Sequence, residues 1–263
     1  MRNQIVLVLI VLSLGMGACT STQKLSYFDN LPESGGEEKF TMSIPDYHIQ
    51  NRDVLYITAK AMTPEGLIID LLAESRTYGG TAYMQSEASQ FLYGHDVTRE
   101  GTVIMPAVGE IKVAGFTLDE ARQRIQQQVA TVFKNATVEC KLLSFKFTVI
   151  GEVRSPGTYI NYSNYITVLE AVGRAGGITD YGRRDKLLVI RPAEGGTKTF
   201  PVNLQDKHLL ANEAYFLLPN DVIIVEPESK KAFNLNLPTY SFILTSVTSA
   251  ITTTLLLINY FKK

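Results

Sequence analysis

Alternation of apolar and polar residues predicts short β-strands over much of the chain. In the segment 47–60, which reads "YHIQNRDVLYITAK", Leu55 and Ile57 share one side of a strand that follows a turn. Two more short strands are predicted in 101–115, "GTVIMPAVGEIKVAG". Residues 64–95 have weaker periodicity, which favours a short helix followed by a long loop.

The segment 116–133 has the helical spacing of apolar residues instead. Thr117 and Glu120 fit a capping box at its start. The apolar stripe consists of Leu118, Ala121, Ile125, Val129 and Val132. The strand predicted after it, "TVECKLLSF", places Cys140 on an inward face, which favours a buried core cysteine over a reactive thiol.

From residue 145 the pattern describes a second β-rich domain. Residues 147–161 predict a hairpin, with Pro156 and Gly157 supplying a type II turn. A short helix capped by Thr167 follows, and three more strands are predicted in 186–191, 198–204 and 219–227. The pieces "NRDVLYI" and "PNDVIIV" echo each other, since each is an acidic turn that leads into a strand.

The first residues have the form of a bacterial export signal. Arg2 precedes a short apolar core, and "MGAC" resembles the lipoprotein signal in which the cysteine, here Cys19, is acylated. An ordinary secretory signal with Cys19 as a bystander is the alternative. Residues 19–39 lack apolar periodicity and predict a lipidated N-terminus and tether.

The last residues form a long uncharged segment. From Tyr240 to Phe261 there is no charged residue, and a helix of that length would span about 33 Å, enough to cross a bilayer. We therefore expect a C-terminal transmembrane helix. On a helical wheel one face carries polar side chains, which makes them the predicted pore-lining set: Ser241, Thr245, Thr248, Ser249, Thr252 and Asn259.

Two other interpretations of this segment remain open. The hydroxyls can instead pack against a neighbouring helix or bond to their own carbonyls, which would make the helix a simple anchor. A spanning β-hairpin is disfavoured because no turn residue interrupts the segment.

Composition excludes several functions. A net charge of −1 does not favour nucleic acid as a partner, and two cysteines do not make a disulfide framework. The three histidines lack ligand spacing, so we expect no metal, no cofactor and no catalytic residues. A carboxylate pair for glycoside hydrolysis is conceivable but has no supporting pattern. The candidate saccharide contacts are Tyr159, Tyr162, Arg183 and Arg184, although half-exposed strand tyrosines are the commoner explanation.

In order along the chain, these segments resemble a known family. Residues 47–57, 101–121 and 137–143 look like the polysaccharide biosynthesis/export domain. The segment "VIGEVRSPGTYINY", the helix after it, "LLVIR" and "NDVIIVEP" look like the soluble-ligand-binding β-grasp (SLBB) domain.

The resemblance implies an α+β chain. The expected boundaries are 1–18 for the lipoprotein signal peptide, 19–39 for the lipidated tether, 40–144 for the export domain, 145–227 for the β-grasp SLBB domain and 228–263 for the linker and transmembrane helix.

The resemblance also implies a function. It predicts an outer-membrane lipoprotein with periplasmic domains that forms a ring-shaped homo-oligomer for capsular or exopolysaccharide. It would work with an inner-membrane copolymerase, often of the tyrosine-kinase type. The alternative is an envelope-anchored SLBB scaffold that binds saccharide without a pore.

Overall fold

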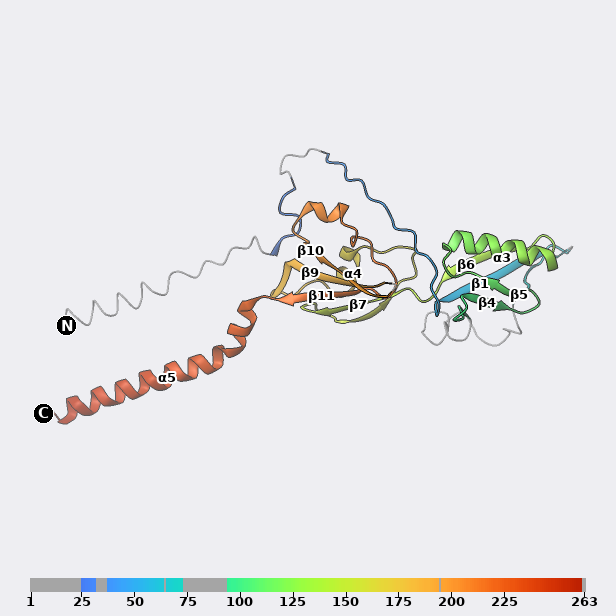
Figure 1. Ribbon diagram of the computed structural model, residues 1–263. Helices are drawn as coiled ribbons and strands as arrows, with labels where there is room; N and C mark the ends of the chain where they lie inside the picture. The colour runs from blue at the N-terminus through green and yellow to red at the C-terminus, as the bar shows by residue number, and fades with distance from the viewer. Residues whose placement is uncertain (1–24, 32–36, 64, 73–93, 194, 262–263) are drawn as a thin grey trace.

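The computed structural model describes the chain except for residues 1–24, 32–36, 64, 73–93, 194 and 262–263. Two small domains lie end to end, and a long helix leaves the second domain on the side away from the first (Figure 1). The predicted export signal and Cys19 lie outside the described residues, as does most of the predicted loop in 64–95.

The first domain is organised around one long strand, β1 (Val54–Met62). This strand pairs antiparallel with the short β2 and β3 and, over six residues, with β6. β4 and β5 form a separate antiparallel hairpin. The bounds of these strands are β2 (Ile68–Asp70), β3 (His95–Asp96), β4 (Thr102–Met105), β5 (Gly109–Lys112) and β6 (Thr137–Leu142).

The helix of this domain, α3 (Leu118–Val132), confirms the prediction for its segment. The Thr117 hydroxyl accepts a hydrogen bond from the Glu120 N–H, and the Glu120 carboxylate accepts one from the Thr117 N–H. Of the predicted stripe, Ala121, Ile125 and Val129 are fully buried against the sheet. Val132 is 47% exposed because the helix ends there.

The second domain contains a five-stranded sheet in the order β10-β9-β11-β7-β8. All its pairs are antiparallel except β11 and β7, which run parallel. Its elements are β7 (Lys146–Gly151), β8 (Gly157–Ile160), α4 (Val168–Arg174), β9 (Gly182–Ala193), β10 (Gly196–Val202), the 3-10 helix η3 (Lys207–Ala211) and β11 (Val222–Pro227).

Each domain has its own core. Leu142 is partly buried against both cores, so it packs at the junction between the domains. The α+β class with two small β-rich domains, predicted from the sequence, is confirmed.

The predicted type II turn at Pro156 and Gly157 is wrong. β7 ends at Gly151, and it is this glycine that has a positive φ, of 92°. A Cβ atom on Gly151 would lie 2.1 Å from the Val225 carbonyl oxygen of the parallel neighbour β11. Five residues then separate the two strands, so the constraint sits at the end of β7 rather than at the start of β8.

Part of the predicted tether is also attached to the second domain. Phe28 N–H donates to the Leu204 carbonyl at 3.1 Å, and Asp29 N–H donates to the Gln205 carbonyl at 2.8 Å. The Phe28 side chain packs against the core of the second domain. We call residues 25–31 the N-terminal strap. A tether was predicted because the segment has no periodic pattern, but the Phe28 ring and these two backbone hydrogen bonds attach residues 25–31 to the second domain.

Candidate functional site

The C-terminal segment forms one helix, α5 (Ser229–Phe261), with Pro238 inside it. The helix projects away from both domains (Figure 1). Among the described residues, no helix combines the length and the apolarity that a membrane span requires. The predicted helix is therefore present, but its assignment as a transmembrane span is not supported.

The predicted pore-lining hydroxyls bond mostly to the helix itself. Thr245 donates to the Ser241 carbonyl at 2.7 Å, and Thr252 donates to the Thr248 carbonyl at 2.7 Å. Ser241 and Thr248 also donate to carbonyls three or four residues earlier. A hydroxyl has one donor and two acceptor positions, so these side chains keep acceptor capacity toward the surroundings. Asn259 lies in α5, but its side chain lies outside what the structure describes.

The opposite side of α5 presents large apolar side chains that are at least half exposed in the single chain. Leu244, for example, is 66% exposed. The rest of this set is Ile243, Val247, Ile251 and Leu257. A contiguous exposed apolar surface of this kind marks a site that another molecule covers.

The four candidate saccharide contacts do not come together. Tyr159 stacks on Phe147, with ring centroids 5.6 Å apart, and its hydroxyl donates to the Ser155 carbonyl. It therefore packs at the edge of the core of the second domain. Tyr162 lies at the junction of the two domains and is 67% exposed. Arg183 and Arg184 lie at the base of α5.

The junction of the domains contains a narrow cleft with aromatic walls. Tyr162 and Tyr165 line it from the second domain, and Tyr47 lines it from the segment before β1. The Tyr165 ring meets Phe216 edge to face at 6.0 Å. Exposed tyrosines of this kind can stack on a sugar ring, so this cleft, rather than the Tyr159 position, is the place where aromatic side chains are available.

Arg183 and Arg184 line a second hollow, which we call the α5-base cavity. Its volume is about 400 Å³, and its wall also contains Gln205, Glu228 and the first residues of α5. Arg183 makes a two-pronged ion pair with Asp185, with N···O distances of 3.1 and 2.6 Å, which raises the pKa of the guanidinium above its usual value.

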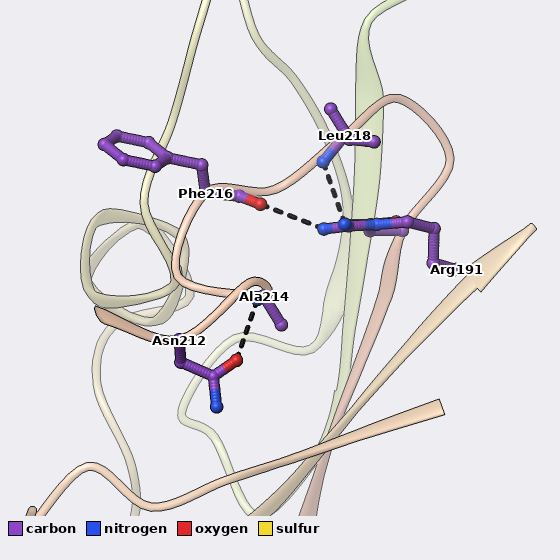
Figure 2. Close-up of polar contacts among 6 residues, drawn as sticks. Arg191, Asn212, Ala214, Phe216 and Leu218 are labelled. Carbon is purple, nitrogen blue, oxygen red and sulfur yellow. Dashed lines mark hydrogen bonds and ion pairs between the residues drawn. The ribbon is translucent and has the colours of Figure 1, made fainter. Parts of the chain in front are cut away.

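A buried ion pair fixes the loop that carries Phe216. The Arg191 guanidinium donates to Asp221 at 2.9 to 3.2 Å. It also donates to the Phe216 carbonyl at 2.9 Å (Figure 2). The Asp221 carboxylate also accepts from the Leu218 N–H at 2.8 Å. Burial raises the pKa of Asp221, while its bonds to Arg191 and Leu218 act in the opposite direction. Because this loop meets Tyr165 through Phe216, the pair holds one wall of the cleft.

Cys140 faces the core of the first domain, as its position in the strand predicts. Burial raises the pKa of its thiol to about 12. Within the described residues, no group of histidine, cysteine and carboxylate side chains has the arrangement of a metal site.

Comparison with known families defines the class of protein. Residues 42–143 match the family described as polysaccharide biosynthesis/export protein, and residues 145–225 match the SLBB domain. The chain therefore contains a polysaccharide biosynthesis/export domain followed directly by an SLBB domain.

Two relatives share one name. The EPS I polysaccharide export outer membrane protein EpsA of Ralstonia nicotianae is 33% identical over 145 residues, which are 53% of this chain and 38% of that protein. Its namesake from Ralstonia solanacearum is 31% identical over 173 residues, which are 62% of this chain and 45% of that protein. The chain thus aligns with less than half of the length of either relative.

Proposed function

We propose that this chain is a non-enzymatic subunit of an outer-membrane polysaccharide export apparatus. In this proposal several copies form a ring, and capsular or exopolysaccharide passes along its axis from the periplasm to the cell surface. The export and SLBB domains build the periplasmic part, Cys19 carries the lipid anchor, and an inner-membrane copolymerase delivers the polysaccharide.

The observation that carries the proposal is the two-faced surface of α5 on a chain with these two domains. Side chains such as Ile243 and Leu244 are exposed in the single chain, so a single copy leaves an apolar surface in contact with water. A ring of copies removes this cost if the apolar faces turn outward to the lipid of the outer membrane and the hydroxyl faces of α5 turn toward the axis.

The hydroxyl face has suitable chemistry for a passing sugar chain. The donors of Thr245 and Thr252 are bonded to helix carbonyls, while their oxygens can still accept hydrogen bonds from water or saccharide hydroxyls. No charged residue lies between Tyr240 and Phe261, so the surface does not hold an acidic polymer by ion pairing. Weak contacts distributed along the helix would let the polysaccharide move along the axis of the ring.

The experiment that tests the proposal is the oligomeric state of the detergent-extracted full chain. Size-exclusion chromatography with light scattering should give a large, closed assembly. The matched control is a chain that lacks residues 238–263, which keeps both domains and should lose part or all of the assembly. A monomer for the full chain would contradict the proposal.

A second candidate function is a saccharide-binding scaffold in which α5 acts only as an attachment. The self-bonded hydroxyls of α5 favour it, because they need no partner, and the exposed Tyr162 and Tyr165 supply a surface for sugar. It predicts binding of oligosaccharide to the monomer, with loss of binding in Tyr162→Ala and no dependence on α5.

A further inference from the structure

Arg184 is a buried guanidinium with few acceptors. It is 7% exposed, and its two recorded hydrogen bonds, to the carbonyls of Gly182 and Ile178, are long, at 3.3 and 3.5 Å. Its Nε atom has no hydrogen-bond partner among the described residues, and none of the ion pairs found there includes Arg184. The Tyr27 ring of the N-terminal strap lies 5.6 Å from it. A buried cation with spare donors lacks an anionic acceptor.

The α5-base cavity, which Arg184 lines, also contains the start of α5. Ser229 and Lys230 are the first two residues of this 33-residue helix, and both line the cavity. The first turn of a helix has N–H groups without intrahelical acceptors and a partial positive charge, so it favours an anion.

The charges around the cavity point to the same kind of ligand. The cations are Arg183, Arg184 and Lys230, and the carboxylates are Asp185 and Glu228. Asp185 is already held by Arg183. The balance is positive, and the volume of about 400 Å³ accommodates a group of headgroup size. A tetrahedral phosphate has enough oxygens to accept from a guanidinium and from helix N–H groups together.

We propose that the α5-base cavity binds a phosphate group, held by Arg184, Lys230 and the first turn of α5. Two sources share this chemistry, namely the headgroup of an anionic lipid and free phosphate. A lipid is within reach if Cys19 is acylated as proposed above, because Leu25 is only six positions after Cys19 and the chain spans at most about 21 Å over that length. The site itself does not depend on ring formation or on export.

The test is calorimetric titration of the full chain in non-ionic detergent with inorganic phosphate and, separately, with dihexanoyl phosphatidic acid. We expect saturable binding. Lys230→Gln should weaken binding about threefold. Arg184→Lys should weaken it about tenfold, because lysine keeps the charge but lacks the paired N–H donors of the guanidinium. The matched control is Lys186→Gln, because Lys186 is also an exposed lysine but pairs with Glu226 outside the cavity. It should bind like the wild type.

Each result decides the proposal. Much tighter binding of phosphatidic acid than of phosphate identifies a lipid headgroup site, and equal binding identifies a site for free phosphate. No binding of either ligand overturns the proposal. Equal weakening by Lys230→Gln and Lys186→Gln also overturns it, because the effect is then nonspecific attraction. Lys230 is exposed, so its variant keeps the test decisive even if Arg184→Lys does not fold. If the full chain forms a ring but binds neither phosphate nor phosphatidic acid, the proposed function stands and this site is refuted.

Discussion

Asp53 and Asp221 occupy the same position in two copies of one turn, one in each domain. Each carboxylate accepts a hydrogen bond of 2.8 Å from the backbone N–H three residues earlier, Gln50 for the first and Leu218 for the second. In both turns the residue before the aspartate has a positive φ, 74° at Arg52 and 67° at Asn220. A strand, β1 or β11, begins directly after it.

The two aspartates differ in the other groups that bond to their carboxylates. Asp53 accepts from the hydroxyls of Tyr47 and Ser144 at 2.8 and 3.0 Å, and Ser144 lies in the link between the domains. Asp221 has the buried cation Arg191 instead. The first turn therefore fixes the domain junction through hydrogen bonds from uncharged donors. The second fixes the loop that carries Phe216 through an ion pair.

The first prediction concerns this difference. Asp221→Asn should lower the free energy of unfolding by about 3–5 kcal/mol, because Arg191 is left as a buried charge without its partner. Asp53→Asn should cost about 1–3 kcal/mol, because only hydrogen bonds change. Urea unfolding measures both, with the exposed Asp119→Asn as the control. A cost for Asp221→Asn no larger than the control would contradict the role of the pair.

The second prediction concerns the close approach of β7 and β11. Gly151→Ala should destabilise the protein by about 2–4 kcal/mol, since the added Cβ would meet the Val225 carbonyl at 2.1 Å on a backbone with positive φ. Gly157→Ala is the matched control, because nothing lies within 4 Å of its Cβ position. Thermal unfolding of both variants gives the comparison, and equal shifts in Tm would show that the approach is unimportant.

The third prediction concerns pH. The thiol of Cys140 has a pKa of about 12 in the folded protein, above its ordinary value, because burial disfavours the thiolate. The resulting stabilisation is fully present below the unfolded pKa, near 8.5, and is lost as the pH rises toward 12. In a Cys19→Ser chain at pH 8, Cys140 should react with iodoacetamide at least about 100-fold more slowly when folded than when unfolded. Equal rates would show that the thiol is accessible.

The fourth prediction concerns the two faces of α5 in the assembled protein. Cysteines at Thr245, Thr248 and Thr252 should react with a membrane-impermeant thiol reagent, because the proposed ring turns them toward water. Cysteines at Val247 and Ile251 should be protected. The chain without these substitutions has only the cysteines Cys19 and Cys140, and its labelling gives the background rate. The same labelling of both sets would favour the scaffold with a plain attachment helix.

The fifth prediction concerns the role of α5 in cells. Removal of residues 238–263 should abolish surface polysaccharide, while the two domains remain folded because their cores lie within residues 49–225. Immunoblotting of membrane fractions checks that the shortened protein is still made and retained. Normal surface polysaccharide in this strain would rule out α5 as part of the export route.

The amino-acid sequence by itself determined the local elements of this protein. The capping box of Thr117 and Glu120, the apolar stripe of α3 and the strand that contains Cys140 depend on neighbours a few residues away, so their patterns are readable in the chain. The order of the two domains was readable for the same reason, since each motif segment is local. The uncharged length of α5 predicted a helix, which is present, and also a transmembrane span, which the described residues do not support.

Only the tertiary structure decided which distant groups meet. Arg191 and Asp221 are 30 residues apart, and no spacing rule connects them. The echo of "NRD" and "PND" marked the two turns, but their different partners come from other strands and from the domain link. The docking of the N-terminal strap beside Arg184, and the close contact at Gly151, likewise depend on how strands pack side by side. Packing of the strands brings residues that are far apart in the sequence into contact. The sequence around each residue does not indicate which distant residue it will meet.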